Sequence, residues 1–253
     1  MTLEICVDDI AGVDAAVSGG ADRLELCAAL TLGGLTPTPS LIAAARDLPI
    51  PVHMLVRPRE GGFRYTARES ALIAADIAAA AEAGLAGVVI GASATDHTLD
   101  SPLLADLVGH ARICGAARGA PLSVTLHRAF DLCPDLPAAL DTAIALGFDR
   151  ILTSGGAAKA IDGLAMLTTL HRAAAGRIVI LPGSGIDASN ATRFLDAGLQ
   201  ELHASCGTTR PSTGVGDSRE RQFGFTAPNR RVTDPGRVRD LKLVLDSFDR
   251  QAA

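Results

Sequence analysis

The chain has 253 residues, of which 48% are apolar and 20% charged, and its formal net charge is −5. This composition excludes an intrinsically disordered chain, and it suffices for one large domain or two small ones. The low aromatic content of 3% and the acidic balance argue against a nucleic-acid-binding surface. The first residues do not resemble a signal peptide, and we see no uncharged apolar run long enough to span a membrane. We therefore expect a cytoplasmic protein with no membrane or nucleic-acid partner.

Short apolar runs recur along the chain, and each is followed by a stretch with helical spacing. We expect strands at 3–8, 23–28, 52–57, 87–92, 122–128, 150–154, 178–183 and 201–206. We expect helices at 9–18, 38–46, 67–83, 101–117, 136–146, 159–174 and 187–197, and a last helix at 234–249.

This alternation is the pattern of repeated βα units, and it predicts an α/β protein with a single (β/α)8 TIM-type barrel. The barrel core spans about 3–207, and a C-terminal segment with a final helix spans 208–253. An open, doubly wound sheet is the alternative fold. The first βα turn, at 7–11, lacks the G-x-G-x-x-G sequence that a dinucleotide-binding sheet of that kind would carry.

The predicted strands have one apolar and one polar face. In the first strand Leu3, Ile5 and Val7 alternate with Glu4 and Cys6, and four other strands divide in the same way. In a barrel the apolar face packs on the helices, so the polar face must line the lumen. The ionisable residues of that face are Glu4, Glu25, His53, Arg57, His127, Glu201 and His203.

Burying so many ionisable groups is costly unless they pair. They indicate either a functional site at the C-terminal mouth of the barrel or an internal salt-bridge network that only specifies packing. If the site is catalytic, the candidate general acids and bases are Glu4, Glu25, His127 and His203.

Residues at the ends of several strands suit an anionic ligand. Arg57 and Arg59 belong to an arginine-rich loop that contains the pair Gly61-Gly62, and guanidinium groups match carboxylate and phosphate. The segment 183–185 is rich in small residues, as barrel phosphate sites are. The candidate anion-binding residues are Arg57, Arg59, Arg128, Asp131, Ser154, Gly183, Ser184, Gly185 and Ser205. A solvated charged loop, and glycines that only permit tight turns, are the alternatives.

Five cysteines without a C-x-x-C motif do not suggest a disulfide framework. Cys6 and Cys27 fall on the polar face of adjacent strands, where two thiols could bind a soft metal such as Cu(I) or Zn(II). The alternative is that each is a small buried apolar side chain. Cys206 is expected on the outward face of the last strand.

Seven segments of the chain, taken in order, are distinctive in combination. They are 4–6, 20–27, 33–37, 56–59, 127–131, 152–155 and 201–205. Together they resemble the CutC family, which is named for copper homeostasis. The resemblance implies a (β/α)8 barrel, a cytoplasmic location and a homo-oligomer, with a dimer favoured. It also implies a role in copper handling, and it places Cys6 and Cys27 where the family's proposed Cu(I) ligands stand.

Two functions follow from these patterns. The first is a copper homeostasis protein that binds Cu(I) at the barrel mouth through Cys6 and Cys27. The second is an enzyme with lyase, isomerase or hydrolase-type acid–base chemistry on a small anionic or phosphorylated metabolite. A Schiff-base mechanism is disfavoured, because the two lysines, Lys159 and Lys242, lie outside the predicted strands.

Overall fold

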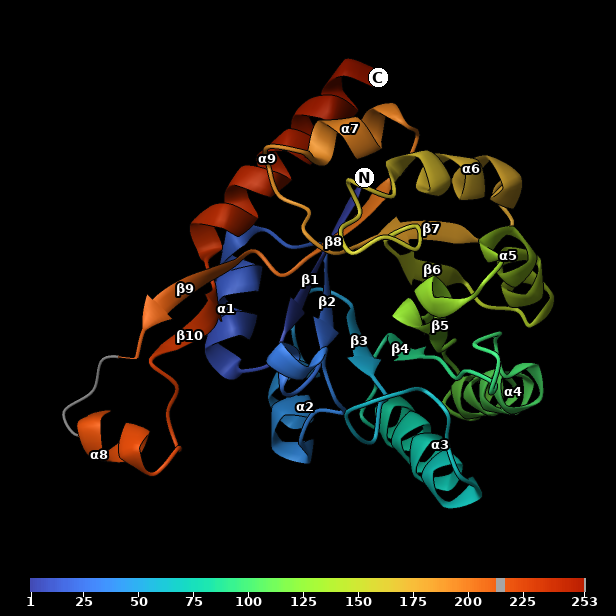
Figure 1. Cartoon of the computed structure of the whole chain (residues 1–253), viewed down its shortest axis with the longest axis horizontal. Helices are drawn as coiled ribbons and strands as arrows, with labels where there is room; N and C mark the ends of the chain where they lie inside the picture. Colours follow the sequence, from blue (N-terminus) through green and yellow to red (C-terminus); the bar gives the residue numbers. More distant parts are fainter. Residues whose placement is uncertain (213–216, 253) are drawn as a thin grey trace.

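The computed structural model describes residues 1–212 and 217–252 of the chain. Eight parallel strands form one sheet in the order β7-β6-β5-β4-β3-β2-β1-β8, and Figure 1 shows them at the centre of the molecule with the helices outside. The strands are β1 (Thr2–Val7), β2 (Arg23–Leu26), β3 (Val52–Leu55), β4 (Gly87–Ile90), β5 (Ser123–Leu126), β6 (Arg150–Thr153), β7 (Val179–Pro182) and β8 (Glu201–Ala204). Because β7 and β8 at the two ends of the order are in contact, the sheet is a nearly closed barrel. The predicted (β/α)8 fold is confirmed.

Helices alternate with these strands and cover the outside of the barrel. They are α1 (Ile10–Gly19), α2 (Pro39–Ala45), α3 (Ala67–Glu82), α4 (Ser101–Ala117), α5 (Leu136–Ala145), α6 (Leu164–Ala174), α7 (Ala191–Asp196) and α9 (Pro235–Ala252). Short 3-10 turns occur at η1 (Leu30–Leu32) and η2 (Arg128–Leu132). The expected helices 159–174 and 187–197 are shorter than predicted, because the residues directly before Leu164 and Ala191 form turns.

The expected division of each strand into two faces is present. Leu3, Ile5 and Val7 are fully buried in the main hydrophobic core between strands and helices. Residues of the other parity meet in the lumen, because the register pairs Cys6 with Glu25, and Glu25 with His53. This register brings ionisable side chains of neighbouring strands close together inside the barrel.

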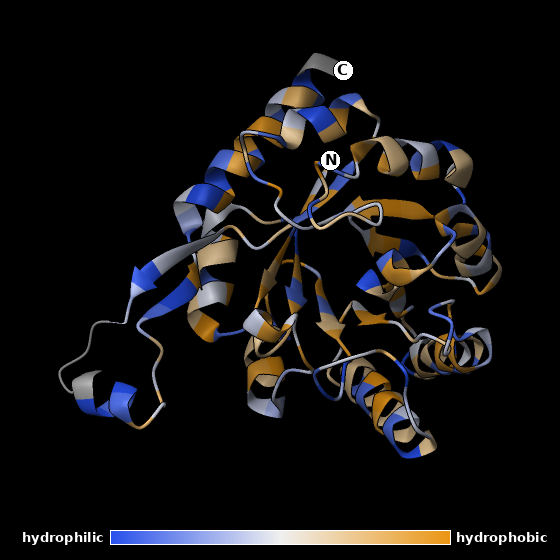
Figure 2. Ribbon diagram, in the orientation of Figure 1, coloured by the Kyte–Doolittle hydropathy of each residue, from blue (hydrophilic) through white to orange (hydrophobic). Residues whose placement is uncertain are grey.

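The C-terminal segment contains elements that the sequence did not predict. β9 (Gly207–Pro211) and β10 (Asn229–Thr233) form an antiparallel hairpin, and α8 (Asp217–Gln222) lies between them in the chain. We call residues 207–212 and 217–233 the arm. Figure 1 shows the arm extending away from the barrel, and Figure 2 shows that its strands are largely hydrophilic.

α9 returns the chain to the barrel, where it contacts α1 and α7. Its apolar side is formed by Val238, Leu241 and Leu245, all fully buried. α9 therefore serves as the eighth helix of the outer layer, between α7 and α1. Within the described part of the chain, no helix combines the length and apolar character needed to cross a bilayer.

Candidate functional site

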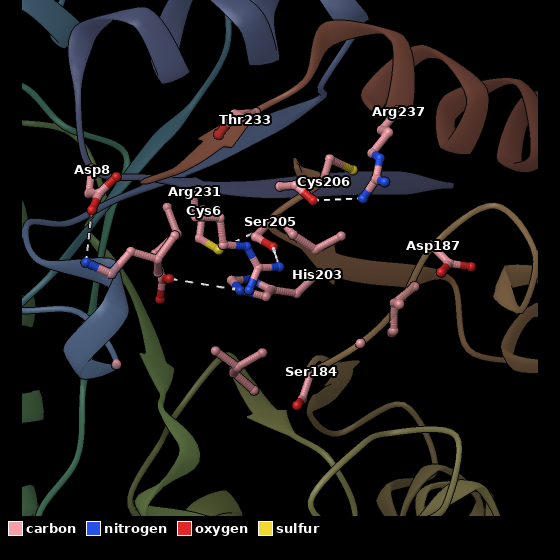
Figure 3. Close-up of a pocket in the computed structure, with 18 of the residues that line it drawn as sticks. Cys6, Asp8, Ser184, Asp187, His203, Ser205, Cys206, Arg231, Thr233 and Arg237 are labelled. Atoms are coloured by element: carbon pink, nitrogen blue, oxygen red, sulfur yellow. Dashed lines mark hydrogen bonds and ion pairs between the residues drawn. The ribbon is translucent and has the colours of Figure 1, made fainter. Parts of the chain in front are cut away.

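A pocket of about 900 Å³ opens at the C-terminal mouth of the barrel. Strand ends form its floor, and residues of β10 and α9 form part of its rim (Figure 3). Of the residues singled out from the sequence, the pocket is lined by Cys6, Glu25, His127, Arg128, Ser184, Gly185, His203 and Ser205. The pocket lining does not include Glu4, Cys27, Arg57, Arg59, Asp131, Ser154 or Gly183.

Three ligand-type side chains converge on the pocket floor. Cys6, Glu25 and His203 each offer one donor atom, and these atoms lie within 4.8 Å of one another. All three residues are buried, and they come from β1, β2 and β8, which are neighbours in the sheet. The arrangement can hold a metal ion, or it can share protons between a thiol, a carboxyl and an imidazole.

A buried charge network lies directly below this cluster. Glu4 Oε1 is 2.8 Å from Nδ1 of His203, and its other oxygen accepts from Nε of Arg23 at 2.5 Å. Arg23 also donates to Glu201, which accepts a further bond from Arg150. An internal salt-bridge network is therefore present, and it supports the pocket because it orients the His203 ring.

The charges of this network shift the pKa values of the cluster. Burial raises the pKa of Glu4, but Arg23 and His203 outweigh burial and hold it well below its usual range. Burial lowers the pKa of His203, but Cys6, Glu4 and Glu25 raise it well above its usual value. Burial raises the pKa of Glu25 to about 7. The floor thus holds an ionised Glu4, a charged imidazole and a carboxyl that titrates near neutrality.

Cys27 stands apart from the Cys6–Glu25–His203 cluster. Its Sγ donates to the backbone oxygen of Val7 at 3.3 Å, and its side chain packs with Leu55 and Val89. Burial raises the pKa of the Cys27 thiol strongly. Cys27 therefore has the environment of a neutral, hydrogen-bonded thiol.

The expected outward orientation of Cys206 is wrong, because this residue lines the pocket. β8 ends at Ala204, and Cys206 has a φ of 45°, so the alternation of a strand does not extend to it. Burial and the nearby Cys6 raise the pKa of Cys206, to about 12. A second thiol thus faces the pocket from a position that strand parity could not identify.

The arginines of the loop after β3 are engaged by the protein itself. Arg57 is buried, and its two terminal nitrogens donate to the backbone oxygens of Leu32, Gly34 and Gly61. Arg59 pairs with Glu69 and donates to carbonyls of its own loop. These contacts tie the loop to the barrel, and they leave Nε of Arg57 without a described partner.

The loops after β5 and β6 are joined through Asp131. This carboxylate accepts from Nε of Arg128 at 2.7 Å and from the backbone and hydroxyl of Ser154. Asp131 thus holds Arg128 at the pocket wall. Ser184 and Gly185 form the turn after β7, and their φ values of 85° and 76° place the backbone of this turn against the pocket.

Two cations of the pocket were missed by the sequence reasoning. Arg231 of β10 donates to Oγ of Ser205 at 2.7 Å, and Arg237 of α9 donates to the carbonyl of Gly207 at 2.7 Å. Figure 3 shows both side chains entering the pocket from the C-terminal segment. The arginine content of that segment was the available signal, but it did not reveal the fold-back that brings these residues to the mouth.

Comparisons with known proteins agree with this architecture. The model of the CutC family matches residues 1–208. The chain is 49% identical over 251 residues to a CutC family protein of Sinorhizobium medicae, an alignment covering 99% of this chain and 98% of that one. It is 47% identical to a CutC family protein of Agrobacterium fabrum, with 100% and 97% covered.

A solved structure is also similar. It is the CutC protein of Streptococcus agalactiae, which was described as a candidate copper homeostasis protein, and it has 27% sequence identity and a TM-score of 0.74. The match covers 81% of this chain and 98% of that chain. With the family model matched along most of its length and relatives of nearly half identity, the chain belongs to the CutC family.

Proposed function

We propose that this protein binds and handles copper, as Cu(I), at the Cys6–Glu25–His203 cluster. The observation that carries the proposal is the convergence of a thiol, an imidazole and a carboxyl within 4.8 Å on the floor of an accessible pocket. The description of the Streptococcus agalactiae relative as a candidate copper homeostasis protein supports copper as the cargo.

The donor set fits Cu(I) through its softer members. Thiolate and imidazole are suitable ligands for Cu(I), whereas a carboxylate is a weaker one. Cys206 lines the same pocket and could add a second sulfur. His203 would bind through Nε2 after losing its Nε2 proton to solvent, with Glu4 holding Nδ1 from behind, as carboxylates behind metal-bound histidines commonly do.

The test is a Cu(I) titration against a colorimetric chelator under reducing conditions. Cys6→Ser is expected to abolish binding that competes with the chelator, whereas Cys27→Ser is expected to retain it. Cys114→Ser is the matched control, because Cys114 lies on α4, away from the pocket. Full affinity in the Cys6→Ser protein would refute this site. Equal losses of affinity in Cys6→Ser and Cys27→Ser would instead favour Cys6 and Cys27 as the two copper ligands.

A second function, acid–base catalysis on a small anionic metabolite, is favoured by a different observation. Glu25 has a pKa of about 7 and lies beside the charged His203, and Arg128, Arg231 and Arg237 line the same pocket. A group that titrates near neutrality is well suited to move a proton at physiological pH, and a copper site requires neither these arginines nor a pocket of this volume.

The enzyme proposal predicts turnover that depends on Glu25. Small phosphorylated and carboxylated metabolites would be screened for stabilisation of the metal-free protein and then for product formation. Glu25→Gln should bind a hit but lose turnover by at least about a hundredfold. A hit converted equally fast by that variant would exclude Glu25 as the acid or base.

We also propose a homodimer and a cytoplasmic location, as the family resemblance implies. The arm is the surface we propose for self-association, because Phe223 and Phe225 are 60% and 82% exposed and their ring centroids stack 6.1 Å apart. Charge supports a second copy as the partner. The arm holds five arginines and two acidic residues, a net charge of +3, on a chain whose total is −5.

A further inference from the structure

The wall of the barrel opposite the Cys6–Glu25–His203 cluster carries polar atoms that copper binding does not use. In the order of the sheet, β5 lies four strands from β1 and therefore faces it across the lumen. Among the described residues, the buried side-chain atoms without a hydrogen-bond partner include Thr125 Oγ1 and His127 Nε2, on β5 and directly after it, and Arg57 Nε and Ser93 Oγ, in the segments that follow β3 and β4. Of these residues, His127 lines the pocket.

One hydrogen bond decides the chemistry of the His127 ring. The backbone N–H of Ala129 donates to Nδ1 of His127 at 3.1 Å, so Nδ1 carries the lone pair. Burial and the charge of Arg57 lower the pKa of His127 to about 3. The ring is therefore neutral at physiological pH, its proton resides on Nε2, and that N–H is a buried donor without an acceptor.

The ring is also held in place. Phe63 packs against it with ring centroids 4.6 Å apart, and a Cβ on Gly91 would lie only 2.4 Å from its Cε1. Arg57 sits over Phe63 at 5.1 Å, with its terminal nitrogens bound to backbone carbonyls and Nε unpaired. A rigid neutral donor beside a fixed guanidinium is an arrangement that receives an oxygen acceptor.

We propose that His127 is a ligand-binding residue that donates its Nε2–H to an oxygen of a small carboxylate or phosphate ligand in the pocket. Such a ligand would give the buried donor its acceptor, and Arg128 and Arg231 on the pocket wall favour its charge. An N–H donor offers nothing to a metal cation, so the site differs in chemistry from the thiol-bearing cluster. The inference rests on the pocket's proposed role as a small-molecule site.

The first test needs no ligand. Long-range proton–nitrogen NMR on histidine-labelled protein should show His127 as the neutral Nε2–H tautomer from pH 8 down to about pH 4. A proton on Nδ1, or a titration near the ordinary histidine pKa, would overturn the proposal. This measurement uses the unmodified chain and so does not depend on a variant that folds.

The second test measures binding of inorganic phosphate and of oxalate to chelator-treated protein. We expect His127→Phe to weaken binding of one or both probes about tenfold to a hundredfold, and His127→Gln, which keeps an N–H donor, to lose less. His110→Gln is the control, because His110 bonds to the carbonyl of Ala74 and does not line the pocket. Unchanged affinity in His127→Phe would refute the proposal, as would no binding of either probe at about 10 mM.

The two proposals fail in different experiments. The anion titration is run with metal removed, and the copper titration is run without phosphate or oxalate. His127→Phe should keep the copper affinity of the unmodified chain, because His127 is not part of the Cys6–Glu25–His203 cluster. Loss of copper binding in His127→Phe with unchanged anion binding would contradict the roles assigned to both walls.

Discussion

Nδ1 of His203 lies 2.8 Å from Oε1 of Glu4, although the two residues are separated by almost the whole length of the barrel sequence. The contact exists because β1 and β8 are neighbours and their register pairs Glu4 with His203. It couples the buried Glu4–Arg23 pair to the pocket floor. A change at Glu4, which does not line the pocket, should therefore be felt by ligands inside it.

The first prediction concerns Glu4→Gln. Loss of the carboxylate leaves Arg23 buried with a weakened partner, so the free energy of unfolding in urea should fall by about 3 kcal/mol. A neutral amide also holds the His203 ring less firmly than a carboxylate, so Cu(I) affinity should fall by about tenfold to a hundredfold. Asp47→Asn, at an exposed Arg–Asp contact, should change neither quantity. Unchanged stability in Glu4→Gln would mean that Glu201 alone suffices to compensate Arg23.

The second prediction compares two glycines. At Gly91 an added Cβ would lie 2.4 Å from Cε1 of His127, and the buried ring has little room to retreat. Gly91→Ala should therefore destabilise the protein by about 1–3 kcal/mol. Gly109, on the exposed side of α4, has no atom within 4 Å of the corresponding position. Gly109→Ala should stabilise by about 0.5–1 kcal/mol, since alanine favours the helix. Thermal and urea unfolding of both proteins checks the pair, and a neutral Gly91→Ala would mean that His127 can move.

The third prediction is a pH dependence that originates at His53. Burial lowers the pKa of His53 to about 3 in the folded chain, against an ordinary value of 6.5. Below pH 6.5 His53 becomes protonated in the unfolded chain but stays neutral in the folded chain. The free energy of unfolding therefore decreases as the pH falls from 6.5 towards 3. Between pH 7 and pH 5, His53→Gln should lose about 2 kcal/mol less stability than the unmodified chain.

Unfolding in urea at the two pH values measures this difference. His97→Asn is the control, because residue 97 is exposed and its positive φ is tolerated by asparagine. That control should keep the pH slope of the unmodified protein. An identical slope in His53→Gln would show that folding does not lower the pKa of His53.

The fourth prediction tests the arm as a contact between copies. Replacing Phe223 and Phe225 together by serine should shift the molar mass in light scattering towards the monomer while the melting temperature stays nearly constant. The two rings are exposed, so their removal costs the single chain little. Leu72→Ser on α3 is the control for a general loss of exposed apolar surface. If the unmodified protein already has the molar mass of a monomer, the proposed self-association through the arm is wrong.

The barrel could be predicted because its signals are local. Apolar runs of strand length, helices between them, and alternation of Leu3, Ile5 and Val7 with polar neighbours are all visible within a few residues. Alternation also identified the lumen-facing Glu25, His127 and His203. The arm was missed, because the antiparallel pairing of 207–211 with 229–233 depends on a long-range register rather than on a local period.

Which of the predicted site residues come together in the pocket depends on contacts between segments that are far apart in the sequence. Cys6 and Cys27 are equivalent by alternation, but the sulfur of Cys6 lies in the cluster with His203, whereas Cys27 follows the end of β2 and packs with Leu55 and Val89. The sequence could not predict that Arg57 would be occupied by backbone carbonyls, or that Arg231 would reach Ser205.

The sequence by itself determined the fold and which residues within the strands face the barrel interior, because both follow from periodicities of two and of about four residues along the chain. Only the tertiary structure decided which of those residues meet, which protons they hold and which donors remain unpaired. Closing the barrel brings β8 beside β1 and buries Glu4, Glu25 and His203 together, and pKa values depend on that burial and on charges a few ångströms away.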